Sequence, residues 1–449
     1  IYGAHWVNHE WLFQILLYWV YSTFSIDGLI NLQVIVITVT FLLFLLLALR
    51  SPNDFISNIL ILLTVLVYQH RFFLRPEIFS LFFFLVFLFI LFTRLDRKYT
   101  HWVLFFIQVV WVNMHGFFIV GPMLCFILLL THVVKERFPL LWQWNKVGVY
   151  SAREFRNLTH IFVFVALACF CNPNFIEGAL YPFKIIFSVS DESRVFFEQI
   201  TELSPTFTWQ SLFDASHFPF LKLLLCLSGL GFILNYRRVD ISLLLIWILL
   251  LALSFMAMRN IVYFAFAACF VSMANFANIQ WQDVGKGLFS RKWLAIFATL
   301  ANGFLILWVG GYVEGLSYRG YYDLENYERK NEYRGVTLRN YPHKAVQFLK
   351  DNQITGNFFN DFNSGAYLIG QLYPQVRVFI DGRTEVYGSD YFKNYNDIWL
   401  GKSSKKFEEA VQKYNLVGAF LSSAHEAPPR MFTKYLYENS DWKLVYFDF

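Results

Sequence analysis

Long runs of apolar residues, almost free of charge, dominate the first two thirds of the chain. About ten of these runs are long enough, or nearly so, to cross a bilayer as helices. They lie near residues 28–49, 55–70, 78–92, 101–113, 117–134, 160–171, 218–234, 241–256, 261–277 and 293–313. The runs are continuous and not alternating, which favours helices over an outer-membrane barrel. The sequence therefore predicts a polytopic α-helical membrane protein with about ten transmembrane helices.

The distribution of basic residues predicts an orientation and four parts. Arginine and lysine gather in alternate turns between the runs, and the positive-inside rule assigns those turns to the cytoplasm. The N-terminus and everything after Val313 are then outside. We expect an external loop with an interfacial helix at residues 1–27, a transmembrane domain at 28–313, a linker at 314–340 and an extracytoplasmic domain at 341–449. Because the chain opens inside a polar loop, we also expect a segment upstream of it.

The last part of the chain is polar and predicts a small soluble α/β domain. Helical periodicity marks "PHKAVQFLKDN" and "KKFEEAVQKYN". Short apolar segments in "GNFFND", "VRVFIDG", "LVGAFLSS" and "WKLVYFDF" predict strands. Alternation of strands and helices is typical of an α/β layer domain.

Several classes of function lack their sequence signature. The five cysteines all lie in apolar runs, which argues against a disulfide framework or a cysteine zinc site. The sequence has no block of basic residues interleaved with aromatic residues, so we expect no nucleic-acid partner. The phosphate-loop, HExxH and GxSxG motifs are absent from the sequence. We predict no metal ligands and no certain cofactor, with a divalent metal left open.

Ionisable residues near the ends of the apolar runs gather on the predicted external side, where such groups are candidates for function. Glu10 precedes an apolar helix, and burial there would raise its pKa toward the range of a general base. The alternative is an acid that simply favours the first turn of a helix. His9 beside it could belong to the site or be an interfacial histidine, and Glu202 in "TELSP" is a second candidate acid.

Arg71, Arg75 and Arg259 are the candidate anion site, because arginine holds phosphate with two hydrogen bonds and keeps its charge. The alternative is that these side chains reach out to lipid headgroups. Asn113 and His115 in "WVNMHG" either face the same external cavity or cap helix ends.

The soluble domain carries a second group of polar residues in "FNDFNSGAYLIG" and "FIDGRTEVYG". The candidates for an acceptor site or a site of this domain are Asp361, Asn363, Asp381, Arg383 and Glu385. Asp381 follows an apolar strand, a position that often carries function in α/β folds. It could equally serve an Asp-Gly turn with Gly382.

The chain resembles the GT-C superfamily of integral membrane glycosyltransferases, near the dolichyl-phosphate-mannose-type enzymes. The resemblance covers most of the chain and is carried by "NHEWLFQILLYWVYSTFSIDGLI", "RPEIFS", "WVNMHG", "NPNF", "ELSP", "RNIVYF" and "FNSGAYLIGQLYPQVRVFIDGRTEVYG". It implies a GT-C-like fold, an acidic base in the first external loop and a polyprenyl-phosphate sugar as donor. The paired acidic motif of the family is not visible upstream of this helix, so either Glu10 acts alone or the acid lies in the missing segment.

The resemblance thus implies an inverting glycosyltransferase, which we expect on the outer side of the bacterial cytoplasmic membrane. Its expected partners are a lipid-linked sugar donor, a glycan, lipid or protein acceptor, and the bilayer. One alternative is a non-catalytic envelope protein that binds or assembles glycans. A transporter or flippase is a further alternative, although no inverted repeat is visible.

Overall fold

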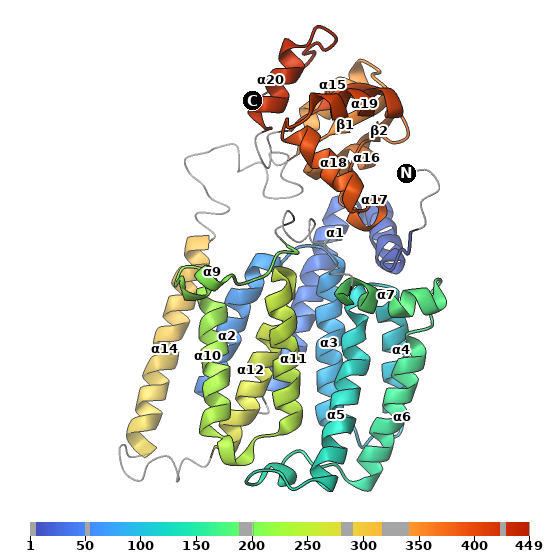
Figure 1. Ribbon diagram of the computed structural model, residues 1–449. Coiled ribbons are helices and arrows are strands. Elements are labelled where there is room, and N and C mark those ends of the chain that lie inside the picture. Colours follow the sequence, from blue (N-terminus) through green and yellow to red (C-terminus); the bar gives the residue numbers. More distant parts are fainter. Residues whose placement is uncertain are drawn as a thin grey trace. The chain divides into compact units, whose positions relative to one another are not determined.

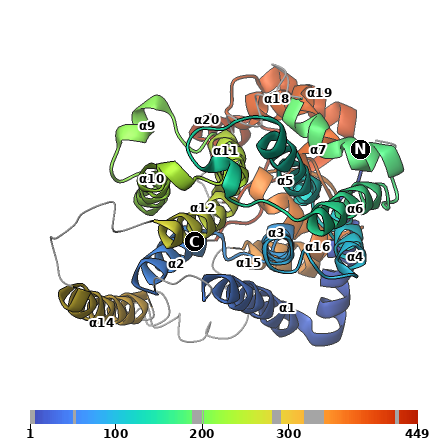
Figure 2. The ribbon, with the colours of Figure 1, turned by 90° about the horizontal axis from the view of Figure 1, so that it is seen from below.

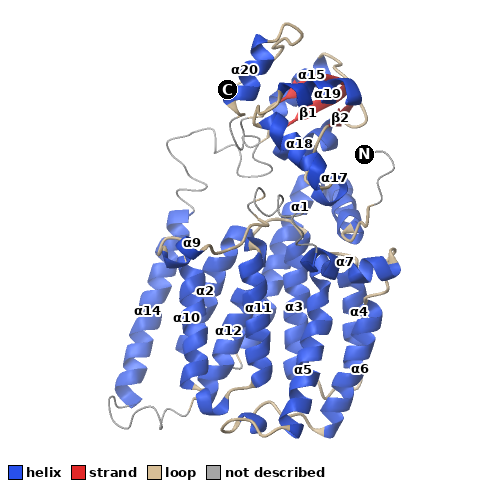
Figure 3. Ribbon diagram, viewed as in Figure 1, coloured by secondary structure: helices blue, strands red, loops and turns tan. Residues whose placement is uncertain are grey.

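The protein is described by a computed structural model that covers residues 6–49, 54–187, 200, 202–279, 291–316, 341–422 and 428–448. It is mostly helical, with one small parallel sheet (Figures 1 and 3). The chain divides into two compact units. The helical unit comprises residues 7–187 and 200–333, and the C-terminal unit comprises 334–449 together with 1–6 and 188–199.

The described part of the helical unit consists largely of helices (Figure 1). The helices are α1 (Trp11–Ala48), α2 (Asp54–Tyr68), α3 (Pro76–Thr93), α4 (Thr100–Val112), α5 (Val120–Arg137), α6 (Ala152–Ala168), α7 (Phe175–Phe187), α9 (Trp209–Phe213), α10 (Pro219–Leu234), α11 (Ile241–Met256), α12 (Ile261–Asn278) and α14 (Arg291–Leu316). Single 3₁₀ turns lie between them, including η1 (Gln69–Arg71), η2 (Gly116–Ile119) and η5 (Met258–Asn260).

Local sequence explains where several of these helices begin and bend. Pro76 occupies the first turn of α3, where a missing N–H costs nothing. At α6, the Ser151 side chain accepts a hydrogen bond from the Glu154 backbone N–H and the Glu154 carboxylate accepts one in return, which forms a capping box. Within α1, Ser25 has non-helical dihedrals (φ 57°, ψ −154°), so the chain bends between two helical segments.

The apolar helices have the character of membrane spans. Among the described residues, four helical stretches are long and apolar enough to cross a membrane, namely Trp11–Ala48, Pro76–Thr93, Gly116–Arg137 and Met258–Asn278. Shorter apolar helices accompany them. Large apolar side chains such as Trp19, Phe24 and Leu42 remain exposed on α1, and an apolar face of that extent indicates contact with lipid. A helical membrane protein is thus supported, while the number of ten crossings stays a prediction.

The core of the helical unit forms around α12. This helix packs against α2, α10 and α11, whereas α4 packs against α6, and α1 against α3 (Figure 2). Phenylalanine fills much of the interface: Phe44, Phe84 and Phe266 are fully buried. Such packing holds the neighbouring helix ends in a defined arrangement.

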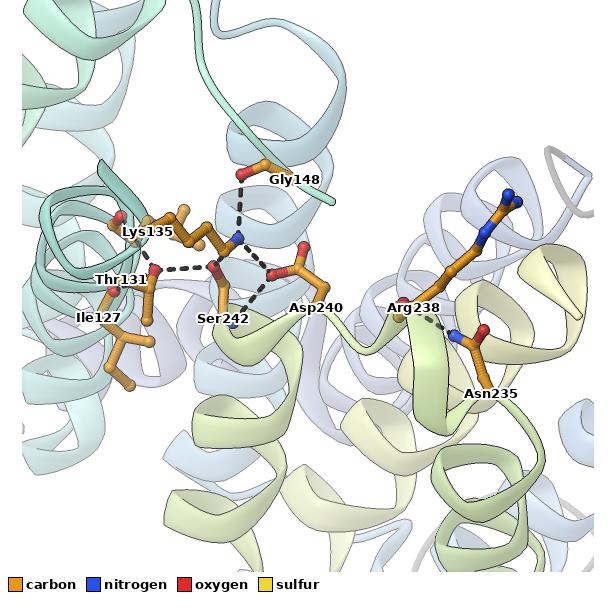
Figure 4. A network of polar contacts seen from close by, with 9 residues as sticks. Ile127, Thr131, Lys135, Gly148, Asn235, Arg238, Asp240 and Ser242 are labelled. Atoms are coloured by element: carbon orange, nitrogen blue, oxygen red, sulfur yellow. Dashed lines mark hydrogen bonds and ion pairs between the residues drawn. The ribbon is translucent and has the colours of Figure 1, made fainter. Parts of the chain in front are cut away.

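A buried ion pair ties α5 to the start of α11 at the end of the bundle where these two helices meet the α5–α6 connection (Figure 4). The Lys135 ammonium donates to Asp240 (2.8 Å) and to the backbone carbonyl oxygen of Gly148 (3.1 Å). Asp240 also accepts from the backbone N–H of Ser242, so it caps α11. Gly148 has a φ of +60°, and a Cβ there would lie 2.1 Å from the Asp240 carboxylate. Glycine is therefore required at this close approach.

The C-terminal unit is a small α/β layer (Figure 3). Its sheet has the order β2-β1-β3 and all its strands are parallel, with β1 at Gly356–Asn360, β2 at Val376–Val378 and β3 at Leu416–Phe420. Its helices are α15 (His343–Asp351), α16 (Gly365–Leu372), α17 (Thr384–Tyr387), α18 (Ser389–Trp399), α19 (Ser404–Tyr414) and α20 (Arg430–Glu438). The register pairs Phe358 with Val378 on one side and with Gly418 on the other.

One strand prediction in this unit is wrong. The segment "WKLVYFDF" forms no strand over residues 442–448. Instead, ring contacts hold it to helices: Trp442 lies 5.3 Å from Phe407, and Tyr446 lies 4.7 Å from Phe348. Apolar composition alone cannot distinguish a strand from an extended segment that packs through its aromatic rings.

Candidate active site

The candidate residues of the helical unit lie at helix ends on one side of the bundle. Glu10 precedes α1, Arg71 ends η1 between α2 and α3, and His115 lies between α4 and η2. Glu202 precedes α9, and Arg259 lies in η5 between α11 and α12. The backbone N–H of Arg259 donates to the carbonyl oxygen of Glu202 (3.3 Å), so these last two segments are joined directly.

Asn113 attaches the start of α1 to the end of α4. Its backbone carbonyl oxygen accepts from the Leu12 N–H (3.1 Å), and its side-chain oxygen accepts from the Trp11 indole (2.8 Å). Its amide group donates to the backbone carbonyl oxygens of Val109 and Cys171. The buried Asn113 side chain therefore uses its hydrogen bonds within the protein. These bonds hold the residues around Glu10 in place.

Glu10 and His9 form one half-buried pair. The His9 Nε2 atom lies 3.6 Å from the Glu10 carboxylate, and the His9 ring packs on Tyr181 with 4.3 Å between ring centres. Burial raises the pKa of Glu10, but the hydrogen bond with His9 and the nearby His115 and Arg259 outweigh it, so the pKa lies below its ordinary value. The pKa shift expected from the sequence had the opposite direction, because burial alone was considered. Glu10 is thus an ionised carboxylate at neutral pH.

Two arginines and two glutamates form an ion-pair cluster at the helix ends of the same unit. Arg71 contacts Glu77 (2.6 Å) and Glu202 (3.2 Å), and Arg75 contacts Glu202 as well. Burial raises the pKa of Glu202, but Arg75 and then Arg71 reverse the shift and hold the pKa below its ordinary value. Glu202 is therefore a paired carboxylate that holds its loop against η1.

Arg259 differs from these two arginines. It is half-buried, and among the residues that the structure describes it forms no ion pair. Its charge still reaches both Glu10 and His115, since it lowers the pKa of each. Of the three arginines predicted for an anion site, Arg259 is the one whose guanidinium group is available to a ligand.

His115 makes its described hydrogen bond through Nδ1, which lies 2.8 Å from the hydroxyl oxygen of Ser80. The same hydroxyl oxygen accepts from the indole N–H of Trp111 (2.7 Å). Burial lowers the pKa of His115 to about 4, and the opposing effect of Glu10 is smaller. His115 is therefore a neutral imidazole at physiological pH.

The pKa of His115 predicts a loss of stability in mild acid. The unfolded chain takes up a proton at His115 near its ordinary pKa of 6.5, whereas the folded protein does so only near about 4. The free energy of unfolding should therefore fall as the pH drops through this window, by roughly 1–2 kcal/mol between about pH 6.5 and 5. We expect thermal unfolding in lipid nanodiscs to show this loss, and His115→Gln to remove it. An equal loss in the variant would assign the effect to other groups.

In the C-terminal unit, the predicted acids hold strand ends together. Asp361 is buried and accepts from the backbone N–H groups of Ser364 and Ser422, which joins the ends of β1 and β3. Burial raises its pKa. Asn360, which the sequence analysis did not single out, is fully buried and binds the backbone of Ile380.

Asp381 is likewise occupied by its neighbours. Its carboxylate accepts from the Arg383 backbone and guanidinium and from the Tyr387 hydroxyl (2.8 Å). Burial raises the pKa of Asp381, but these hydrogen bonds hold it below its ordinary value. Arg383 also lies over the Trp6 ring (5.7 Å). Asp381 thus combines the turn role with the positioning of Arg383.

The two remaining candidates of this unit lie close by. Asn363 is exposed in the turn before α16. Glu385 belongs to α17, and its side chain lies outside the described part of the structure. A Cβ at Gly365 would lie 2.1 Å from the carbonyl oxygen of Ile380, so the motif "FNSGAYLIG" needs glycine where α16 crosses the end of β2.

Sequence reasoning missed Ser80 and Trp111 as partners of His115. The available signal was a lone serine in the otherwise apolar "PEIFSLFFF", since polar groups inside apolar helices are candidates for function. Within the described residues, no three histidine, cysteine, aspartate or glutamate side chains are grouped to hold a metal ion.

A scan of the chain against models of protein families finds no match, and a search of curated proteins finds none either. The function is therefore inferred from the side chains and their arrangement.

Proposed function

We propose that the protein is a membrane glycosyltransferase that takes a sugar from a polyprenyl-phosphate donor. The proposal rests on one arrangement above all: the Glu10 carboxylate, the His115 imidazole and the Arg259 guanidinium lie at helix ends on the same side of an apolar helical bundle, and Arg259 forms no ion pair among the described residues. The GT-C resemblance supports the same assignment. The site would work on the extracytoplasmic side of a bacterial cytoplasmic membrane.

The proposed reaction assigns one task to each group. The Glu10 carboxylate takes the proton of the acceptor hydroxyl while the hydroxyl oxygen attacks the anomeric carbon. The bond between that carbon and the phosphate oxygen breaks, and the polyprenyl phosphate leaves with the electron pair. Attack opposite to the leaving group inverts the anomeric carbon. Arg259 offsets the charge that develops on the departing phosphate.

The first experiment measures release of polyprenyl phosphate by the full chain in lipid nanodiscs. A panel of polyprenyl-phosphate sugars is supplied with glycan, lipid and protein acceptors. The proposal expects release with at least one donor and formation of an inverted glycosidic bond. Binding of donors without release from any of them would support the non-catalytic glycan-binding alternative, and donor movement across the bilayer without release would support a flippase.

Arg259→Ala tests the anion site. If Arg259 stabilises the departing phosphate, its loss lowers kcat by roughly 10²–10³-fold, as removal of one such donor does in other enzymes. Arg259→Lys should recover only part of the rate, because lysine lacks the planar pair of donors. Arg97→Ala is the matched control, since Arg97 is exposed and pairs only loosely with Asp96 (3.8 Å). Equal rates in the two alanine variants would contradict the assignment.

A further inference from the structure

The hydrogen bonds around Ser80 determine which nitrogen of His115 carries the proton. Ser80 lies in α3 and is completely buried. Its hydroxyl oxygen lies 2.7 Å from the indole nitrogen of Trp111, which ends the last turn of α4, and 2.8 Å from Nδ1 of His115. Three segments of the bundle thus meet at one hydroxyl group.

The direction of these two hydrogen bonds follows from what each group can donate. An indole N–H donates and cannot accept, so Trp111 uses a lone pair of the Ser80 oxygen. Ser80 keeps a single hydrogen to donate. The Tyr263 hydroxyl donates to the backbone carbonyl oxygen of Glu77 (3.4 Å), and its oxygen remains a further acceptor beside Ser80. The acceptor at a short distance from the Ser80 hydroxyl is Nδ1 of His115 (2.8 Å).

The opposite arrangement would carry a penalty. If Nδ1 of His115 bore the proton, it would donate to Ser80, and the buried Ser80 hydroxyl hydrogen would lose its short partner. A buried donor without a partner costs about 1–3 kcal/mol. The short bond from Ser80 to Nδ1 therefore favours the neutral His115 ring with its proton on Nε2.

The Nε2 atom of His115 remains available. Among the described residues, Nε2 has no hydrogen-bond partner. It is also not one of the side-chain atoms that are completely buried without a partner, so it keeps some solvent exposure. Residue His115 as a whole is not fully buried. The charges of Glu10 and Arg259 both act on it, so the open N–H lies within the candidate site.

We propose that Trp111 and Ser80 are positioning residues that hold His115 as the Nε2–H tautomer, so that this N–H donates a hydrogen bond to a phosphate oxygen of the donor substrate. A neutral N–H within the electrostatic influence of Arg259 adds a contact to an anionic oxygen, where hydrogen bonds are strongest. The tautomer stands on the hydrogen bonds alone. The phosphate contact rests on the proposed function.

The tautomer is measured first, by magic-angle-spinning NMR on the full chain in lipid bilayers with labelled histidine. The His115 signals are those that disappear in His115→Gln. We expect a ring protonated at Nε2 and bare at Nδ1 in the wild type, a mixture of tautomers in Ser80→Ala, and the wild-type form again in Ser80→Thr. A proton on Nδ1 in the wild type would overturn the proposal whatever the enzyme does.

A matched control exists within the same bundle. The Trp247 indole donates to the buried Ser228 hydroxyl (2.9 Å), which repeats the tryptophan–serine bond with no histidine attached. Ser228→Ala therefore removes a similar hydrogen bond and should leave the His115 signals unchanged. If the His115 signals change in Ser228→Ala as much as in Ser80→Ala, a general loosening of the bundle moves His115. That result would overturn the positioning role of Ser80.

Kinetics then tests the phosphate contact. We expect Ser80→Ala to raise the KM for the donor and lower kcat/KM about tenfold, while Ser228→Ala changes neither. His115→Gln should retain more activity than His115→Asn, because only the glutamine amide reaches the position of Nε2. If no donor is turned over by the wild type, the proposed function fails while the tautomer result stands. If turnover occurs and Ser80→Ala equals Ser228→Ala, the phosphate contact is wrong.

Discussion

Glu10→Gln is expected to reduce the release of polyprenyl phosphate by roughly 10²–10⁴-fold, the usual contribution of a general base. Glutamine keeps the size of the side chain and removes its ability to take a proton. Because the pKa of Glu10 lies below its ordinary value, the wild-type rate should stay level as the pH falls from 7 toward about 5. A base with a raised pKa would instead lose activity over that range. The rate and its pH profile are measured with the same donor and acceptor.

The control for this experiment is an exposed carboxylate. Asp96→Asn changes an exposed acid between α3 and α4 and should leave the rate unchanged. An unchanged thermal unfolding midpoint in Glu10→Gln would separate lost chemistry from lost fold. Release that survives in Glu10→Gln would mean that another acid is the base. The ion pairs of Glu202 with Arg71 and Arg75 make Glu202 a poor substitute, so such a result would overturn the assignment of the base.

The periodicity and composition of the sequence suffice to predict many of the helices and strands. Continuous apolar runs predict α3, α5 and α12, and the apolar segments of the polar third predict β1, β2 and β3. These elements depend on local patterns, which a sequence carries directly. The segment at 442–448 shows the limit, because an extended chain becomes a strand only where it lies along a sheet edge, and this segment packs through its rings on Phe407 and Phe348 instead.

The sequence predicts where the candidate site lies. It predicts the hydrogen bonds and ion pairs among the residues of the site less well. Sidedness of the helix ends predicts that Glu10, His115 and Arg259 lie on one side of the bundle, and the structure has all three at helix ends there. Sidedness cannot show that Asn113 and Glu202 are already engaged by other groups, because those partners come from distant segments. The pKa of Glu10 was mispredicted for the same reason: the sign of the shift depends on neighbours that only the packed bundle supplies.

Lys135→Met is expected to cause the largest loss of stability of any single change considered. It leaves the Asp240 carboxylate without its cation, and breaking a buried pair in this way costs about 3–5 kcal/mol. The Asp240 side chain keeps 12% exposure, so we expect the lower end of that range. The midpoint of thermal unfolding in nanodiscs should fall by several degrees. Lys98→Met is the control, since Lys98 is exposed, and it should change the midpoint little.

A double-mutant cycle separates the ion pair from the packing around it. In Lys135→Met with Asp240→Asn, the asparagine can still cap α11 through the Ser242 N–H, and no buried charge remains. The double variant should therefore be more stable than Lys135→Met alone, since the main penalty is an unpaired charge. Simple addition of the two single effects would contradict this account. The catalytic rate should change less than the stability, because this pair lies at the opposite ends of α5 and α11 from His115 and Arg259.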